Sequence, residues 1–295
     1  LVTAQVGWKD MVYVDGSYRV DWYRAFRQFR NRGTADHYGY FSLGANAIVS
    51  QLVKMPEWVS YLKYRASYSE VGNSIPNIVF ATGVRDLEKG STSVSPFGKF
   101  ENPVPEKTKS FEMGIESSFF GSKLDFDFTF YNTISDNLYM IASNAAGKRV
   151  PVNSGKVRNR GFETTLAYNF KFAKDFTWRT QANFSFNDNT ILNVATNPDG
   201  SDALVYNDIA GVRVNNLKGG RIGDMYVTDF RRKADGTFEM EDDGDGLLRE
   251  TQVNKLYKKY VGNMNSKIQL GWSNTINYKD FQLFFLINGR VGGKV

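Results

Sequence analysis

Cysteine is absent from this chain of 295 residues. Disulfides, thiolate metal sites and cysteine nucleophiles are therefore excluded. Histidine is nearly absent as well, because His37 is the only one, and it has no second histidine with which to form a metal site or a catalytic triad. We assign His37 no role, so neither residue type supplies a candidate catalytic group.

Long apolar runs are also missing. The longest strongly apolar run lies near Phe284–Ile287, whereas a membrane helix needs roughly 18–20 apolar residues. This excludes a helical membrane protein but not a membrane barrel, whose strands alternate apolar and polar residues. Apolar residues make up only 41% of the chain while aromatic residues reach 15%, and that combination is unusual for a soluble core.

Charge is modest and spread along the chain. The net charge is +6, yet no run of five or more Lys and Arg occurs. We therefore favour an excess distributed over loops rather than a dedicated surface for lipopolysaccharide or another acidic partner. Neither a phosphate-binding glycine loop nor a basic and aromatic nucleic-acid module is evident, so we expect no cofactor and no nucleic acid.

The dominant pattern has a period of two, which predicts β-strands. In residues 123–131 the apolar set comprises Leu124, Phe126, Phe128 and Phe130, while the polar set comprises Asp125, Asp127 and Thr129. Residues 176–187 and 267–278 repeat this pattern. No comparable stretch has a helical period with caps, so we expect little helix.

Ten strands are predicted. They cover residues 1–8, 11–24, 38–50, 60–71, 108–120, 123–141, 156–170, 176–188, 266–278 and 281–290. Each approaches or exceeds the ~9–11 tilted residues that cross a bilayer. Strands of soluble proteins average about 5–6 residues, so the lengths favour a transmembrane antiparallel barrel over a soluble sandwich.

Connections of two lengths alternate along the chain. The short ones are Lys9–Asp10, Gln51–Val59, Gly121–Ser122, Lys171–Asp175 and Lys279–Asp280. The long ones are Ala25–His37, Gly72–Lys107, Ser143–Gly155 and Asn189–Asn265. One rim of the sheet therefore carries tight turns and the other carries all large loops. Outer-membrane barrels have this asymmetry, with short periplasmic turns and long extracellular loops.

The short turns also predict strand register. A hairpin at Gly121–Ser122 places Phe119 opposite Leu124, and the Lys279–Asp280 hairpin places Tyr278 opposite Phe281; both arrangements keep apolar residues on one face. The first hairpin also sets Glu116 opposite Asp127, and the second sets Trp272 opposite Ile287. Aromatic residues flank every short turn, which is typical of the interfacial girdle of a membrane barrel.

Several segments carry a family resemblance. Glu101–Gly114 (ENPVPEKTKSFEMG) resembles a segment of TonB-dependent outer-membrane receptors. Asn153–Leu166 (NSGKVRNRGFETTL) and Leu62–Asn73 (LKYRASYSEVGN) resemble strands of the SusC/RagA branch of that family. Gly220–Tyr226 and Gly289–Lys294 are similar to later members of the series, although no proline stands between Gly220 and Ile222.

The resemblance implies a barrel of about 22 strands around a plug. Residues 1–295 would then form part of a single barrel domain, with ten consecutive strands present and the plug and the terminal strands absent. No signal peptide begins at Leu1. We therefore expect the chain to be a fragment whose true N-terminus lies upstream.

The same resemblance implies a function and a set of partners. It implies TonB-dependent import of a large nutrient, an oligosaccharide or a peptide, across a bacterial outer membrane. The partners would be a SusD-like surface lipoprotein, a TonB complex acting through the plug, and outer-membrane lipids including lipopolysaccharide. Two alternatives remain: a non-transporting structural subunit bound to other subunits of a larger complex, and a complete ten-stranded enzyme.

Charged residues gather on the predicted lumen face. They are Arg19, Asp21, Lys63, Arg65, Glu112, Glu116, Asp125, Asp127, Glu163 and Arg179. Glu116 opposite Asp127 could serve acid–base chemistry. We favour a hydrated wall instead, because Lys63 and Arg65 on the adjacent strand can balance both carboxylates. We therefore predict no catalytic residue and no enzyme activity, and look to the loops Gly72–Lys107 and Asn189–Asn265 for substrate or partner contacts.

One acidic segment is similar to a calcium-binding loop. Glu241, Asp243 and Asp245 occupy alternate positions before Gly246, as the first ligands of such a loop do. The twelfth position is Gln252 rather than a glutamate. We therefore favour an acidic surface turn and predict no metal site.

Overall fold

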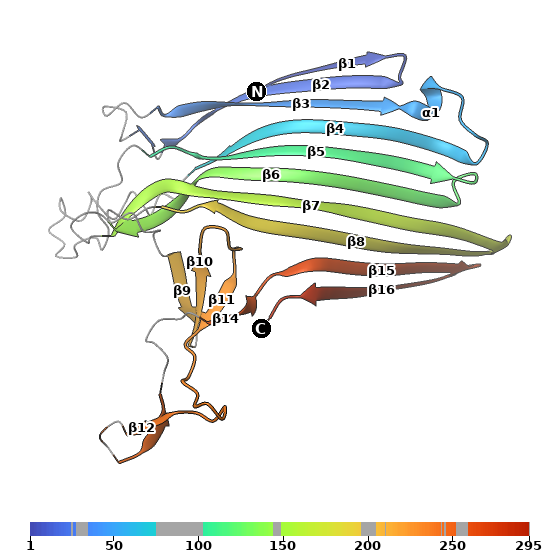
Figure 1. The fold of residues 1–295 in the computed structure, drawn as a ribbon. Coiled ribbons are helices and arrows are strands. Elements are labelled where there is room, and N and C mark those ends of the chain that lie inside the picture. Colours follow the sequence, from blue (N-terminus) through green and yellow to red (C-terminus); the bar gives the residue numbers. More distant parts are fainter. Residues whose placement is uncertain are drawn as a thin grey trace.

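The computed structural model describes residues 1–24, 26–27, 35–74, 103–143, 149–195, 205–209, 211–242, 244, 246–251 and 259–294. Its main feature is one antiparallel sheet of ten strands, in the order β1-β2-β3-β4-β5-β6-β7-β8-β15-β16 (Figure 1). The strands are β1 (Val2–Trp8), β2 (Val12–Trp22), β3 (His37–Ile48), β4 (Val59–Asn73), β5 (Glu106–Phe119), β6 (Leu124–Ser143), β7 (Arg149–Ala173), β8 (Phe176–Asn193), β15 (Ser266–Tyr278) and β16 (Phe281–Gly292).

All ten predicted strands are present, and the all-β prediction is confirmed. Each pairs with its neighbour along the chain, except that β8 pairs with β15 across the intervening segment. The tight turns lie together at one end of the sheet, and the long connections leave from the other end (Figure 1). We call these the turn end and the loop end.

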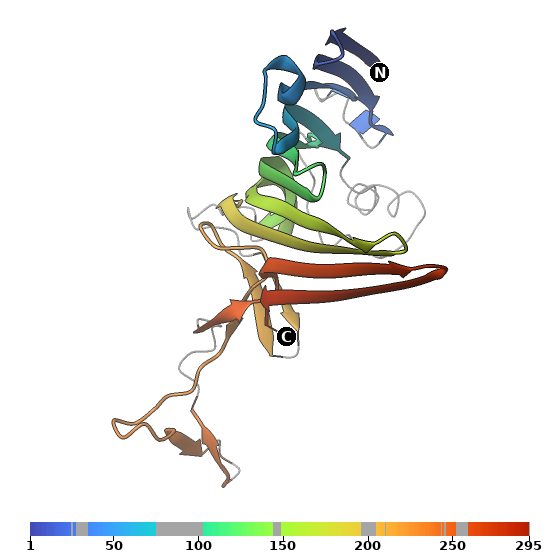
Figure 2. The same cartoon turned by 90° about the vertical axis from the view of Figure 1, so that its right-hand side faces the viewer.

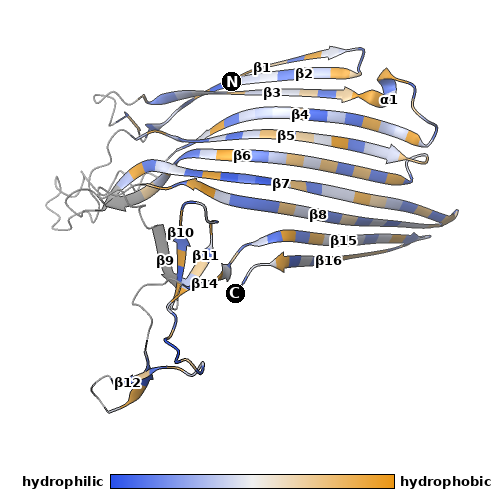
Figure 3. Ribbon diagram, viewed as in Figure 1, coloured by the Kyte–Doolittle hydropathy of each residue, from blue (hydrophilic) through white to orange (hydrophobic). Residues whose placement is uncertain are grey.

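The predicted register is also confirmed. Phe119 pairs with Leu124 and Glu116 with Asp127 between β5 and β6. Tyr278 likewise pairs with Phe281 between β15 and β16, where Trp272 faces Ile287. Hydropathy alternates along the strands (Figure 3), because successive side chains point to opposite faces. The sheet therefore has one polar face and one apolar face.

The first hairpin shows how a tight turn is built without glycine. Lys9 and Asp10 both have positive φ, at 52° and 55°, and the amide of Met11 donates to the carbonyl of Trp8 at 3.0 Å. Two consecutive positive-φ residues define a type I′ turn, whose twist matches that of the flanking strands. The short connection predicted at this position is therefore a true β-turn.

The prediction that Asn189–Asn265 is one long loop is wrong in detail. Strand β8 continues to Asn193, and the segment contains a second, four-stranded sheet in the order β14-β11-β10-β9. Its strands are β9 (Val205–Ile209), β10 (Val212–Asn216), β11 (Asp224–Val227) and β14 (Lys259–Asn263), and β12 (Met240–Asp242) pairs separately with β13 (Leu248–Glu250).

A buried carboxylate on β11 joins two strands of this second sheet, β11 and β14. Asp224 accepts hydrogen bonds from the Arg221 amide at 2.8 Å and from Asn263 Nδ2 at 2.8 Å. The hydroxyl of Tyr260 donates to it at 3.3 Å. Burial and the neighbouring Asp224 raise the pKa of Tyr226 above its usual value. Short strands stabilised by polar contacts have no clear alternation, which explains why their sequence reads as a loop.

Two smaller boundaries also differ from the predictions. Strand β6 runs to Ser143 and β7 begins at Arg149, so most of the predicted loop Ser143–Gly155 is strand. The strand predicted at residues 38–50 ends at Ile48 and gives way to the short helix α1 (Val49–Leu52). Within the described ranges, no helix has the length and apolar character needed to cross a membrane.

The apolar face of the large sheet is not covered by a second layer of the described chain. The sheet curves as a single layer (Figure 2), and the buried cluster around Val157, Ile191 and Val194 lies near the loop end. Many large apolar side chains on the apolar face are exposed; Phe281 is 77% exposed and Leu283 is 57% exposed. A contiguous exposed apolar surface of this kind marks a contact with lipid or with another protein.

Candidate functional site

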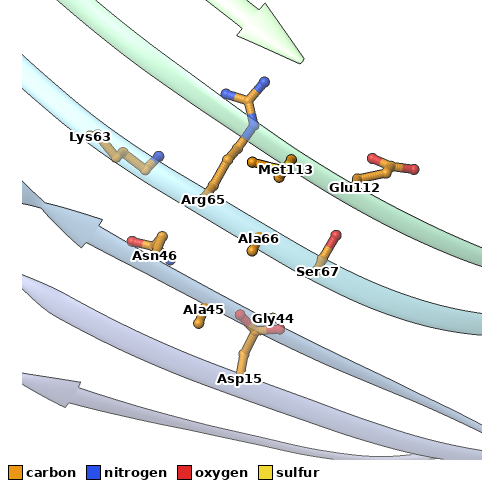
Figure 4. A pocket seen from close by; sticks show the side chains of 10 residues that line it. All are labelled: Asp15, Gly44, Ala45, Asn46, Lys63, Arg65, Ala66, Ser67, Glu112 and Met113. Carbon is orange, nitrogen blue, oxygen red and sulfur yellow. The ribbon is translucent and has the colours of Figure 1, made fainter. Parts of the chain in front are cut away.

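The candidate site is a hollow on the polar face of the large sheet, with a volume of about 220 Å³. Figure 4 shows the side chains that line it. One row across the sheet forms its centre, because Asp15 pairs with Gly44, Gly44 with Ser67 and Ser67 with Glu112. Carboxylates therefore stand at both ends of this row, with only small residues between them.

An arginine joins three strands beside the hollow. Arg65 on β4 forms an ion pair with Glu116 on β5 and another with Asp127 on β6, at 3.1 Å. The same guanidinium donates to the hydroxyl of Thr129. Lys63 adds a second ion pair to Glu116 at 3.3 Å. The predicted balance of these two carboxylates by Lys63 and Arg65 is confirmed.

A glycine makes room for this arginine. Gly114 lies between Arg65 and Thr129 in the same row of the sheet. A Cβ at that position would lie 2.8 Å from Arg65 Nε and 2.9 Å from the carbonyl oxygen of Phe128, which is closer than a Cβ contact allows. Gly114 ends the segment Glu101–Gly114 that carried part of the family resemblance, and a glycine at this position has a physical reason: the side chain of Arg65 passes over β5 there.

Of the six other predicted lumen charges, four form two ion pairs, and Glu112 lines the hollow and accepts a hydrogen bond from Ser110. Arg179 pairs with Asp125 at 3.1 Å, and Arg19 pairs with Asp21 at 3.0 Å. Glu163 forms no ion pair with the described residues, although it lies on the same face. The structure thus places all the predicted residues on one face, but gathers only Lys63, Arg65, Glu116 and Asp127 into a continuous network.

This arrangement has the chemistry of a hydrated wall. A carboxylate that works as a general acid needs its neutral form stabilised. Glu116 and Asp127 instead both form ion pairs with the guanidinium of Arg65. The acid–base interpretation of this pair finds no support in the geometry.

The other candidate residues lie away from the hollow. His37 begins β3, where its ring stacks on Trp22 at 6.2 Å and contacts the Asp36 carboxylate at 3.2 Å. Glu241 is exposed on β12, whereas Asp243, Asp245 and Gln252 lie outside the described residues. The calcium-loop candidate stays a prediction. Elsewhere in the described chain, no group of three or more acidic or histidine side chains could hold a metal ion.

Three polar residues that line the hollow were not predicted from the sequence. Two of them are uncharged, and the third is an isolated aspartate. Asp15, Asn46 and Ser67 line the hollow but are not among the residues predicted from the sequence. Their only signal in the sequence is their position: Asp15 shares strand parity with Arg19 and Ser67 with Arg65, while Asn46 pairs with Arg65 across β3 and β4. Cross-strand rows reveal such residues only after the register of several strands is known.

The turn end carries a continuous chain of aromatic rings. Trp178 stacks on Phe170 at 4.7 Å, Phe170 on Phe172 at 5.5 Å, and Phe172 contacts Phe176 at 5.4 Å. Phe176 then reaches Tyr278 on β15 at 6.2 Å. A curved antiparallel sheet with one hydrated face, one apolar face and an aromatic belt at its turn end is the wall of a transmembrane β-barrel.

Comparison with known proteins identifies the barrel. Residues 2–283 match the family model described as TonB dependent receptor-like, beta-barrel. The chain therefore belongs to the TonB-dependent receptor β-barrel family and lies in the outer membrane of a bacterial cell. Its polar face lines the lumen, its apolar face meets lipid, and its turn end is periplasmic.

Individual relatives agree with this family. TonB-dependent receptor P3 of Formosa agariphila is 23% identical over 292 residues, covering 88% of this chain and 28% of that protein. TonB-dependent receptor P39 of the same organism is 28% identical over 73% of this chain and covers 21% of its relative. The chain thus spans less than a third of the length of these relatives.

The fold is also similar to a solved structure. The RagAB peptide importer in its open-open state superimposes with a TM-score of 0.74 at 17% identity, over 99% of this chain and 32% of that one. The family resemblance that the sequence motifs carried is thus confirmed, and at the level of fold it extends to RagAB.

Proposed function

We propose that the protein containing this chain imports a large nutrient, an oligosaccharide or a peptide, across the outer membrane. One observation carries the proposal: the lumen face is lined by charges that pair across strands, such as Arg65 with Asp127. Such a face is stable only in contact with water, and a barrel wall of this length encloses a wide lumen. The fold similarity to a peptide importer supports the same function.

The proposal includes the rest of the barrel. Residues 1–295 are part of a single domain of about 22 strands that surrounds a plug. A TonB complex supplies energy through that plug. No catalytic role is proposed for this wall, since Glu116 and Asp127, which pair across β5 and β6, share one arginine.

A SusD-like surface lipoprotein is the proposed partner at the loop end. The segment that carries β9 to β14 extends from that end (Figure 1). Among the residues that the structure describes, it is therefore the candidate for the contact with the lipoprotein. Residues 75–102, in the other candidate loop, lie outside the described residues. Outer-membrane lipids, including lipopolysaccharide, are the proposed neighbours of the apolar face.

Uptake tests the proposal directly. Deleting the gene should abolish growth on one class of polymeric nutrient, glycan or protein, and stop accumulation of the labelled oligomer in the periplasm. Supplying the intact gene should restore both. Unchanged growth and unchanged uptake on every polymeric nutrient would refute import.

A structural role in a larger complex is the second candidate, and one feature favours it. The β12–β13 hairpin forms an exposed arm, in which Leu248 is 66% exposed and Met240 is 42% exposed. Exposed apolar groups on an arm are suited to a protein partner. Purification in mild detergent distinguishes the two hypotheses. A single lipoprotein that co-purifies would support import, whereas several unrelated subunits would support a structural role in a larger complex.

A further inference from the structure

A basic cluster lies on the lipid-facing side of the sheet, near its loop end. Arg160 on β7 pairs with Asp188 on β8, and Arg158 pairs with Thr190 one row higher. Both arginines share strand parity with Phe162, so they point toward lipid rather than into the lumen. Lys267 reaches the same place, because its Nζ lies 2.6 Å from Asp188 Oδ1.

This cluster has an excess of positive charge. Asp188 is the one carboxylate in it and is already engaged by Lys267. Arg158 and Arg160 form no ion pair within the described part of the chain. The Nε atom of Arg158 is buried and has no hydrogen-bond partner there, while Arg160 is exposed. Two arginines are therefore available to an anion.

The height of the cluster matches the outer membrane interface. Asp188 lies twelve residues along β8 from Phe176, which belongs to the periplasmic aromatic belt. At about 3.3 Å per residue and a tilt of roughly 45°, the cluster lies about 28 Å above that belt. The apolar band of a membrane barrel is about 25 Å tall, so the cluster stands at the level of lipid headgroups in the outer leaflet.

An apolar groove lies below the cluster on the same face. Its volume is about 430 Å³, and its outward-facing lining includes Ala182, Phe184, Leu270, Trp272, Ile287 and Gly289. Ala182 and Gly289 are small and form its floor. No charged side chain lines it, so it accepts hydrocarbon.

The indole ring of Trp272, beside the groove, is held in its orientation by a hydrogen bond. Trp272 pairs with Ala182 across the strands, yet its Nε1 donates to Thr180 Oγ1 at 2.9 Å. Thr180 lies one row nearer the periplasmic turns, so the indole leans away from the space above Ala182. The hydrogen bond also satisfies a donor that has no other partner in hydrocarbon, and it keeps the groove open.

We infer that this face binds one phosphorylated lipid of the outer leaflet. Its phosphate lies between Arg158 and Arg160, and one acyl chain descends past Phe186 into the groove over Ala182 and Gly289. Arginine binds phosphate through two parallel hydrogen bonds, and the bilayer supplies the chain at the depth of the groove. The inference rests on the lipid neighbours included in the proposed function, and does not depend on import.

Lipid binding by the protein purified from outer membranes and stripped of lipid tests this inference. Diphosphoryl lipid A is titrated while native mass spectrometry counts bound lipid. The double variant R158Q/R160Q should raise the apparent Kd about tenfold or more, since each charged hydrogen bond it removes is strong. A182L/G289L fills the groove and should weaken binding without changing charge. A Cβ at Gly289 would meet only Leu270, at 3.9 Å, so the second change is compatible with the fold.

R290Q is the matched control, because Arg290 pairs with Gln269 in a row of the lumen face and its loss should leave lipid binding unchanged. If lipid A binds equally well to the wild type and to R158Q/R160Q, or if R290Q weakens binding as strongly, the inference is wrong. Inorganic phosphate competing as well as lipid A, or phosphatidylglycerol binding as tightly, would also overturn it. Nutrient uptake measured on the same variants should be unchanged, so failure of import and failure of lipid binding are distinguishable.

Discussion

At the scale of single residues, the lumen wall depends on side chains that cross from strand to strand. Arg65 extends over β5 to reach Asp127 and Thr129 on β6. Its planar guanidinium presents several donors at once, which an ammonium group does not. This explains why one arginine organises the charges of three strands.

Replacing Arg65 with methionine should destabilise the barrel. Glu116 would keep only Lys63, and Asp127 would lose its cation. The Arg65, Glu116 and Asp127 side chains are 33%, 34% and 40% exposed, so water screens the charges and the loss should be only about 1 kcal/mol. Urea unfolding in lipid vesicles measures it. Arg65→Lys should restore part of the loss, whereas equal stability of Arg65→Met and the wild type would contradict the network.

On the lipid face, Asn274 is a buried polar residue that must be matched to its neighbour. It is fully buried, and its Oδ1 accepts a hydrogen bond from Trp178 Nε1 at 2.9 Å. Its Nδ2 has no partner among the described residues. The side-chain carbonyl oxygen of Asn274 therefore has a hydrogen-bond partner, whereas its amino group has none among the described residues.

A double-mutant cycle should show this asymmetry. Asn274→Leu alone leaves the indole donor of Trp178 unpaired and should cost about 1–3 kcal/mol. The double variant Trp178→Phe/Asn274→Leu removes both the donor and the acceptor, so it should regain most of the stability that Asn274→Leu alone loses. Unfolding free energies of the four proteins measure the coupling. Simple additivity of the two single changes would show that the hydrogen bond contributes nothing.

At the scale of elements, the predictable features are those that arise from alternation and from turns. The ten strands and the register around Gly121 and Lys279 follow from parity, because a slip of one residue would mix the two faces. The second sheet does not follow, since its strands are short and the pairing of β11 with β14 is stabilised by a buried polar contact of Asp224 with Asn263. Lys63, Arg65 and Glu112 of the hollow are predictable from the sequence, whereas Asp15 is not. The shape of the hollow is not predictable either, because it depends on Gly44 and Ser67 meeting across strands.

Gly114 should tolerate no side chain. In Gly114→Ala the new methyl group meets Arg65 and the backbone oxygen of Phe128, and the backbone contact cannot be relieved by rotating a side chain. Overpacking of this kind costs typically about 1–3 kcal/mol. Unfolding in lipid vesicles should show the loss in Gly114→Ala and none in Gly289→Ala, where the nearest atom is 3.9 Å away. Equal stability of the two variants would remove the packing role assigned to Gly114.

At the scale of the whole molecule, short and long connections lie at opposite ends of the sheet, and this asymmetry defines the orientation of the barrel in the membrane. Short turns such as the one before Leu124 gather at one end of the sheet, and the segment that carries β9 to β14 leaves from the other (Figure 1). With the apolar face toward lipid, this asymmetry places the loop end outside the cell. Import, lipoprotein contact and lipid binding all presuppose that orientation.

Site-directed labelling tests the orientation most directly, because this chain supplies no cysteine of its own. Lys218→Cys lies beside the loop end and Lys123→Cys in a periplasmic turn, and both lysines are exposed. In intact cells a membrane-impermeant maleimide should label Lys218→Cys and leave Lys123→Cys unlabelled until the outer membrane is permeabilised. Labelling of Lys123→Cys in intact cells, with Lys218→Cys protected, would contradict the account of this chain as an outer-membrane barrel wall with its loops outside.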